Sequence, residues 1–134
     1  MMKISEVSEQ YDISADMLRY FERVGLIPRV NRSESGIRDY NELDLRRVDF
    51  IKCMRGAGLP VEVLTHYMEL VQQGDETIEA RKEILVEQRD LVAARMEEMQ
   101  KTLDRLNYKI DVYEKALLKK EQEMLQVEEL QSTA

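Results

Sequence analysis

The stretch Ser14–Gly25, with the sequence SADMLRYFERVG, decides how the N-terminal part of the chain is interpreted. Ser14 is a favourable N-cap, because its hydroxyl can accept a hydrogen bond from an amide of the first helical turn. Gly25 is a favourable stop, since glycine readily adopts the left-handed backbone that ends many helices. Residues 15–24 are therefore predicted to be helical. Three apolar residues at helical spacing are expected to face inward: Met17, Leu18 and Phe21.

A shorter helix is predicted over residues 3–10, because Ile4 and Val7 lie three residues apart and form one apolar edge. Only a tight connection over residues 11–13 separates the two helices. Two short helices joined in this way have the outline of a helix-turn-helix, in which the second helix enters the major groove of DNA. Four residues near the N-terminal half of that helix are expected to face the DNA: Ala15, Asp16, Arg19 and Tyr20.

The next stretch, residues 26–40, has a different composition. Pro28, Gly36 and a mixture of arginine, asparagine and serine predict an extended ribbon with a turn at residues 34–36. An arginine-rich hairpin beside a recognition helix is the wing of a winged helix, which contacts the DNA backbone or the flanking minor groove. The net charge of the whole chain is −7, but residues 19–38 hold five arginines and only two glutamates. Local charge governs binding to phosphate, so the acidic total does not exclude DNA.

Two further helices complete a first domain, which is predicted to span residues 1–74. Asn41 is placed to cap the third helix, with Asp44 in a position like that of a capping box. The buried stripe of this helix is expected to consist of Leu45, Val48 and Ile51. A glycine-rich break at residues 56–58 ends it, Pro60 suits the first position of a fourth helix, and Gly74 suits its end.

No glycine or proline follows Gly74, so the chain from Thr77 to about Lys120 is predicted to be one long helix. At about 1.5 Å per residue, such a helix would extend for on the order of 65 Å, which is longer than one small domain can cover. Its apolar residues alternate in steps of three and four and form a heptad seam, interrupted by Arg89, that needs a partner helix from a second copy. The expected dimer-interface residues are Leu85, Val92, Met96, Met99, Leu103, Leu106, Ile110, Tyr113 and Leu117.

The predicted fold is therefore mainly α, with a winged helix-turn-helix domain followed by a long coiled-coil dimerisation helix. The expected divisions are the DNA-binding domain over residues 1–74, the dimerisation helix over residues 75–120, and a polar tail over residues 121–134 that frays.

Four segments of the first 73 residues resemble the MerR family of bacterial regulators: KISEV at 3–7, DMLRYFERVGLIP at 16–28, SGIRDY at 35–40 and DLRRVDFI at 44–51. Phe21 and Ile37 depart from the family pattern, which often has tyrosine at both positions. The resemblance implies a homodimer joined by antiparallel long helices. It also implies a palindromic promoter operator, at which the dimer bends and untwists the DNA to activate RNA polymerase. The implied DNA contacts are Arg19, Tyr20, Arg38 and Tyr40, with Arg23 and Arg47 beside them.

The single cysteine, Cys53, lies in the sequence FIKCMR at residues 50–55. This context is similar to that of the NmlR/AdhR-like subgroup, in which a cysteine of this region is the proposed sensor of aldehydes, electrophiles or redox stress. Lys52 and Arg55 favour a reactive thiolate, whereas Asp49 and the C-terminal end of the helix dipole oppose it. The alternative is an inert, part-buried packing residue. Thiolate binding of soft metals is not expected, because the start of the long helix and the tail contain no cysteine.

Other classes of protein would require features that this sequence lacks or shows only in part. The sequence contains no glycine-rich phosphate loop, Ser/His/Asp grouping or metal-ligand spacing, so neither an enzyme nor a bound cofactor is expected. A coiled-coil interaction module without DNA binding stays open, since a short arginine run is often only a solvated face. A small thiol redox protein using Cys53 also stays open, although Cys53 lacks a resolving cysteine. Without a membrane-span-like stretch or an export signal, a cytoplasmic location is expected.

Overall fold

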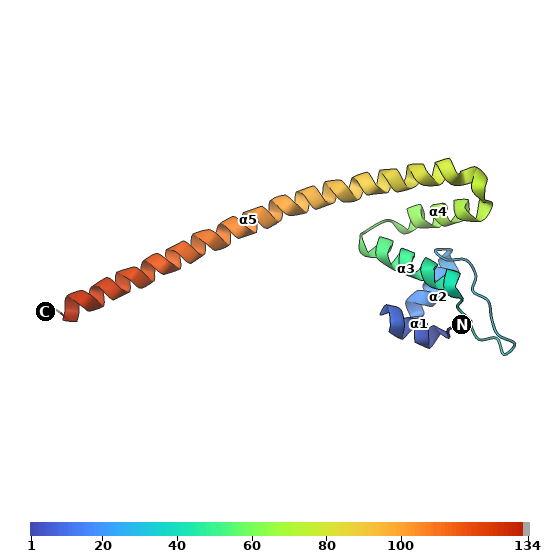
Figure 1. The fold of residues 1–134 in the computed structure, drawn as a ribbon, viewed down its shortest axis with the longest axis horizontal. Helices are drawn as coiled ribbons and strands as arrows, with labels where there is room; N and C mark the ends of the chain where they lie inside the picture. The colour runs from blue at the N-terminus through green and yellow to red at the C-terminus, as the bar shows by residue number, and fades with distance from the viewer. Residues whose placement is uncertain (133–134) are drawn as a thin grey trace. The chain divides into compact units, whose positions relative to one another are not determined.

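The computed structural model describes residues 1–132 and is almost entirely helical. Its elements, in chain order, are α1 (Ile4–Tyr11), α2 (Ala15–Val24), α3 (Glu42–Gly56), α4 (Val61–Gln73), a short 3-10 helix η1 (Asp75–Thr77) and α5 (Ile78–Ser132). Within these residues there is no regular strand, only two isolated antiparallel bridges, Met2 with Tyr40 and Arg32 with Arg38. The prediction of a mainly α fold with a long C-terminal helix is confirmed (Figure 1).

The helix ends follow the predicted local chemistry. The Ser14 hydroxyl accepts a hydrogen bond from the Met17 amide at 3.1 Å and caps α2. Gly25 ends the same helix with a φ of 85°, in the left-handed region that glycine adopts without strain. Asn41 and Asp44 form the reciprocal capping box of α3, at 2.8 and 3.0 Å. Pro60 is the N-cap residue of α4, so this helix begins one residue later than predicted.

The chain divides into two compact units, and the first spans Met1–Asp90. Its core receives side chains from all four short helices and from the loop between α2 and α3, which extends away from the helices in Figure 1. The fully buried residues with the largest side chains are Tyr40, Phe21, Leu18, Leu26, Ile27, Ile51, Leu64, Val7 and Val48. Met17 is an exception to the prediction, because 42% of its surface is exposed. None of the first three residues of α2 is buried, so Met17 lies beyond the edge of the core.

The first unit also includes the beginning of α5, and does not stop at the expected boundary at residue 74. Thr77 is buried, and its hydroxyl donates to the carbonyl oxygens of Leu70 at 2.6 Å and Gly74 at 2.8 Å. Arg81 of α5 in turn donates to the Thr77 hydroxyl and to the Gly74 carbonyl, both at 3.0 Å. These bonds join the end of α4 to the first turn of α5.

The second unit is the remainder of α5, from Leu91 onward. The expected frayed tail is wrong for residues 121–132, which continue the helix. Glutamate, glutamine, leucine and methionine dominate this stretch, and all four favour helix strongly enough to extend it. Residues 133 and 134, the end of the predicted tail, lie outside the described residues. None of the described helices is both long and apolar enough to cross a membrane.

Candidate nucleic-acid interface

The predicted recognition helix α2 presents a polar face with several charged side chains. Asp16, Arg19 and Arg23 are exposed, while Ala15 and Tyr20 are partly exposed. An Arg19 Nη1 atom lies 2.9 Å from an Asp16 carboxylate oxygen. Such a solvent-exposed ion pair contributes little free energy, so the Arg19 guanidinium is available to a phosphate. The Arg23 guanidinium lies over the Tyr20 ring, 5.5 Å from its centroid, so the two side chains pack against each other.

The predicted wing is a short hairpin with its turn at residues 34–36. The Asp39 amide donates to the Asn31 carbonyl and the Ser33 amide to the Ile37 carbonyl, both at 2.7 Å. Gly36 closes the turn with a φ of 83°, where a side chain would strain the backbone. Arg32 is exposed and donates to the Gly36 carbonyl at 2.9 Å.

Arg38, a predicted DNA contact, lies at the base of this wing and is mostly buried. Its Nε atom donates to a carboxylate oxygen of Glu22 on α2 at 3.2 Å. The same oxygen accepts the Val30 amide at 3.4 Å. Arg38 therefore joins the recognition helix through one nitrogen only, and Glu22 is a residue of the site for which the sequence carries no signal.

The prediction that Tyr40 contacts DNA disagrees with its position. The Tyr40 side chain is completely buried, and its hydroxyl has no hydrogen-bond partner among the described residues. Burial raises the pKa of Tyr40, and the nearby Arg38 partly opposes this rise. The Tyr40 backbone pairs with Met2 through two hydrogen bonds of 2.8 and 3.0 Å. Tyr40 is therefore a core residue that anchors the end of the wing.

Arg47 lies on α3 and is partly exposed. It borders an open pocket of about 250 Å³ whose lining comes from α3 and α4. The other lining residues are Leu43, Arg46, Phe50, Tyr67, Met68 and Val71. Within residues 1–132 no hydrogen bond or ion pair links Arg47 to α2 or to the wing, so its assignment to the DNA contacts stays a prediction.

Cys53 lies in the last turns of α3 and its side chain is exposed. The alternative of a part-buried packing residue is therefore wrong, since the core side of α3 is filled by Val48 and Ile51. The neighbouring cations bind backbone oxygens: Lys52 donates to the Tyr11 carbonyl, and Arg55 donates to the Leu59 carbonyl at 2.8 Å. Among residues 1–132 no group of three or more potential metal ligands is found.

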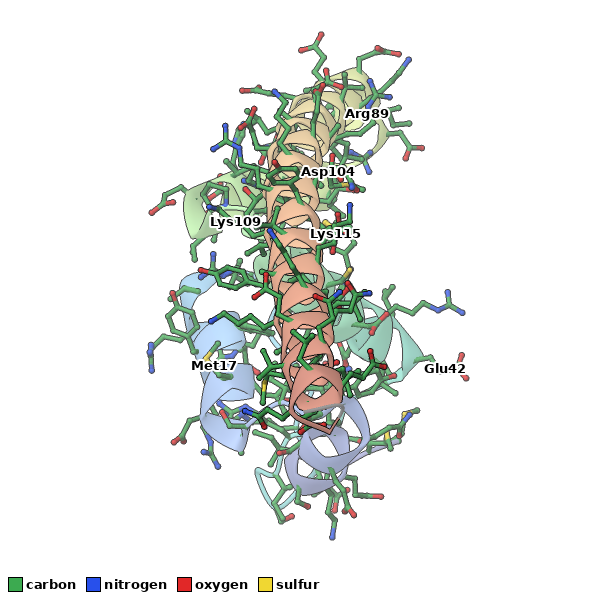
Figure 2. The ribbon with its side chains drawn as sticks, turned by 90° about the vertical axis from the view of Figure 1, so that its left-hand side faces the viewer. Met17, Glu42, Arg89, Asp104, Lys109 and Lys115 are labelled. Atoms are coloured by element: carbon green, nitrogen blue, oxygen red, sulfur yellow. The ribbon has the colours of Figure 1, made fainter. Side chains whose placement is uncertain are left out.

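The predicted seam of α5 has no covering partner within the first 132 residues of one chain. Leu85 and the seven seam residues from Met96 to Leu117 are all exposed, and Val92 is partly exposed. Charged side chains of the same helix, such as Lys109 and Lys115, also project into solvent (Figure 2). An apolar stripe of this length on a single helix is typical of a helix that pairs with another.

Comparison with known proteins assigns the chain to a protein family. Residues 2–71 match the family described as MerR HTH family regulatory protein, and residues 45–108 match the one described as MerR, DNA binding. The chain belongs to the MerR family. It is therefore a DNA-binding transcription regulator of the MerR type.

Individual relatives agree with this assignment. The HTH-type transcriptional regulator AdhR of Bacillus subtilis is 54% identical over 88 residues, which are 66% of this chain and 63% of AdhR. A MerR family regulator from Listeria monocytogenes has a similar crystal structure, with a TM-score of 0.87, 44% identity, and coverage of 92% of this chain and 94% of that one. HiNmlR, described as a MerR family regulator lacking the sensor domain and bound to promoter DNA, has a TM-score of 0.78 at 32% identity and covers 85% of this chain and 90% of its own.

Proposed function

We propose that this MerR-family chain binds a palindromic promoter operator as a homodimer and activates transcription by bending and untwisting the DNA for RNA polymerase. Two copies of α2 enter successive major grooves, and the two wings contact the flanking backbone. The observation that carries the proposal is the exposed Asp16–Arg19–Arg23 face of α2, followed directly by the arginine-bearing wing. The promoter DNA bound to HiNmlR supports the same arrangement. A cytoplasmic location follows from action on promoter DNA.

The exposed cations of α2 are the proposed backbone and base contacts. Arg19 leads, because only a weak ion pair with Asp16 holds its guanidinium. Tyr20 and Arg23 come next, and the packing of the Arg23 guanidinium over the Tyr20 ring restricts the rotamers of both side chains. Ala15 and Asp16 complete the proposed contact surface at the start of the helix, where a small or hydrogen-bonding side chain can approach a base edge.

The test is a titration of operator binding against salt, on duplex DNA from the promoter upstream of the chain's own or adjacent gene. Released counterions make log affinity fall linearly with log salt, with a slope of about −0.9 for each phosphate contacted. A coiled-coil interaction module would show no such slope. Arg19→Ala is expected to weaken binding by about tenfold or more.

Lys115→Ala is the matched control. Lys115 is also the cation of an exposed intrahelical pair, 3.0 Å from Asp111, and its loss changes the charge by the same amount (Figure 2). Lys115→Ala should leave operator affinity unchanged within error. Equal losses for the two variants would mean that charge alone governs binding and that α2 is not the recognition helix.

The proposed signal is an aldehyde or another electrophile that reacts with Cys53. The thiolate sulfur adds to the electrophilic carbonyl carbon, and the carbonyl oxygen takes a proton from water. Two observations support this: the side chain is exposed, and the preceding residue, Lys52, connects α3 to the end of α1 through the Tyr11 carbonyl. An adduct on Cys53 is therefore placed to alter the contact between α3 and the helix-turn-helix.

Cys53→Ser separates the sensor from the regulator. We expect the variant to bind the operator like the wild type but to leave the promoter unresponsive when an aldehyde is added. The measurement is transcription from the promoter with and without the aldehyde. Continued induction in Cys53→Ser would exclude Cys53 as the sensor. The proposal that the protein binds DNA would still stand.

A further inference from the structure

Glu22 connects the recognition helix to both limbs of the wing through a single carboxylate oxygen. Its Oε1 atom accepts the backbone amide of Val30, on the outgoing limb, at 3.4 Å. It also accepts Nε of Arg38, on the returning limb, at 3.2 Å. The Glu22 side chain is only 10% exposed, so these bonds are shielded from water and from salt.

Apolar side chains such as Val30 and Tyr40 anchor the ends of the wing in the core, but the wing has few other polar attachments to the rest of the first unit. Its limbs meet at a single bridge, Arg32 with Arg38, and form no regular strand. The returning limb is tied at its end by the backbone pair of Met2 and Tyr40. Within residues 1–132, the Leu26 and Ile27 amides bond to the Phe21 carbonyl where α2 ends, and further along the wing the hydrogen bonds to α2 are those of Glu22. Glu22 thus sets where the wing lies relative to the helix that carries Arg19.

Arg38 is held in a way that leaves it able to bind an anion. A guanidinium has five N–H donors, and Glu22 uses the one on Nε. Neither Nη atom of Arg38 has a hydrogen-bond or ion-pair partner within residues 1–132. A guanidinium fixed at Nε, with both Nη groups free, presents the planar fork that suits a phosphate.

We infer that Glu22 is a positioning residue for DNA binding, which holds the wing against α2 and aims the Nη groups of Arg38 at a backbone phosphate beside the recognition helix. This inference rests on the proposed function. It gives an acidic residue a favourable part in binding a polyanion. Simple electrostatics predicts the opposite, because removing a carboxylate near DNA should strengthen binding.

The opposite signs make operator affinity a decisive measurement. We expect Glu22→Ala to weaken binding about tenfold, and the salt slope to become shallower by about 2, because each protomer loses one phosphate contact worth about 0.9. Glu22→Gln keeps an oxygen that can accept both bonds, so it should stay within about threefold of wild type with an unchanged slope. Glu34→Ala is the control, since Glu34 is an exposed acid of the wing turn, and its loss should leave binding equal or slightly tighter.

Two further measurements separate positioning from damage to the fold. In hydroxyl-radical footprints, Glu22→Ala should lose protection at the outer edges of the operator and keep it in the half-site centres. A merely unstable variant would lose all protection together and keep the slope. If Glu22→Ala does not fold by circular dichroism, Arg38→Gln replaces it, because the glutamine amide can still donate to Glu22 but brings no positive charge to a phosphate. Its slope should become shallower to the same extent.

The possible failures are distinguishable. If the wild-type dimer shows no salt-dependent operator binding, the proposed function and this inference are both overturned. If the wild type binds with the expected slope, and Glu22→Ala binds as tightly or more tightly with that same slope, only the positioning inference is overturned. An unchanged slope in a folded Arg38→Gln dimer has the same consequence.

Discussion

The two units of this regulator differ in how far their apolar side chains are exposed to water. In residues 1–90, Leu18 and Phe21 lie in a core shared by the four short helices and the wing, and they lose nearly all contact with water. From Leu91 onward the apolar residues are as regularly spaced, yet Leu103 is still 49% exposed and its seam neighbours are exposed with it. One helix cannot bury its own stripe, because its side chains point away from its axis. The first unit therefore completes its core within one chain, and the second requires another copy.

The largest expected effect comes from breaking the seam of the second unit. Leu103→Lys would place an ammonium group in each seam of the dimer, and desolvating each charge costs several kcal/mol. The dissociation constant of the dimer should rise on the order of 10⁴-fold, as each 1.4 kcal/mol is a factor of ten. Sedimentation analysis should show monomers. Operator binding should also fall, although the added positive charge alone would favour DNA.

The control for this change is the adjacent residue. Asp104→Asn alters the charge by the same +1 and removes only an exposed carboxylate that accepts a bond from Gln100 at 2.9 Å. It should remain dimeric. A dimeric Leu103→Lys protein would contradict the assignment of the seam as the dimer interface.

A smaller effect is expected from truncating the core of the first unit. Leu18→Ala should lower the free energy of unfolding by about 2–5 kcal/mol, because the cavity cannot be filled by its packed neighbours. Met17→Ala, one residue earlier, should cost less than about 0.5 kcal/mol, since Met17 is exposed (Figure 2). Urea unfolding of the two variants measures the difference. Similar losses would mean that Met17 belongs to the core after all.

The smallest effect is expected at Tyr40. Tyr40→Phe should keep the free energy of unfolding at neutral pH within about 1 kcal/mol of wild type, because the lost hydroxyl has no partner among residues 1–132. Operator affinity should not change, since the hydroxyl cannot reach DNA from the core. A large loss of affinity would restore Tyr40 as a direct contact.

Tyr40 also predicts a dependence on alkaline pH. Burial raises the pKa of Tyr40 above its ordinary value of 10.0, so the folded state favours the neutral phenol. The resulting stabilisation is complete below pH 10 and is lost as the pH rises through the raised pKa. As the pH rises from 10 through the raised pKa, wild-type stability should therefore fall more steeply than the stability of Tyr40→Phe. Parallel curves would show that Tyr40 does not titrate from a buried position.

Much of the fold was predictable because it depends on local chemistry. Ser14, Gly25 and the Asn41–Asp44 pair end or begin helices as expected, since a cap needs only residues within one turn. The wing turn at Gly36 follows for the same reason. The polar composition of the tail predicts fraying, but residues 121–132 continue α5, because the same polar residues have a high helix propensity.

The candidate site was less predictable. The exposure of Arg19 and Arg23 follows from helical spacing, so the sequence identifies the exposed polar side of α2, which is the proposed DNA-facing side. Tyr40 and Arg38 lie two residues apart in the same extended limb. Tyr40 is buried in the core, whereas Arg38 bonds to Glu22 through Nε and keeps its Nη groups free. That distinction depends on which segments pack against each side chain, and no periodicity in the sequence contains it.

The sequence by itself determined the order of the helices, their caps, the wing turn and the apolar stripe of α5, because each is set by neighbours within a few residues or by a repeat along one helix. The MerR assignment rests on motifs of the same local kind. Only the tertiary structure decided that Glu22 holds Val30 and Arg38, that Tyr40 is buried and that Cys53 is exposed. These features arise where separate segments meet, and their geometry depends on how the whole core packs.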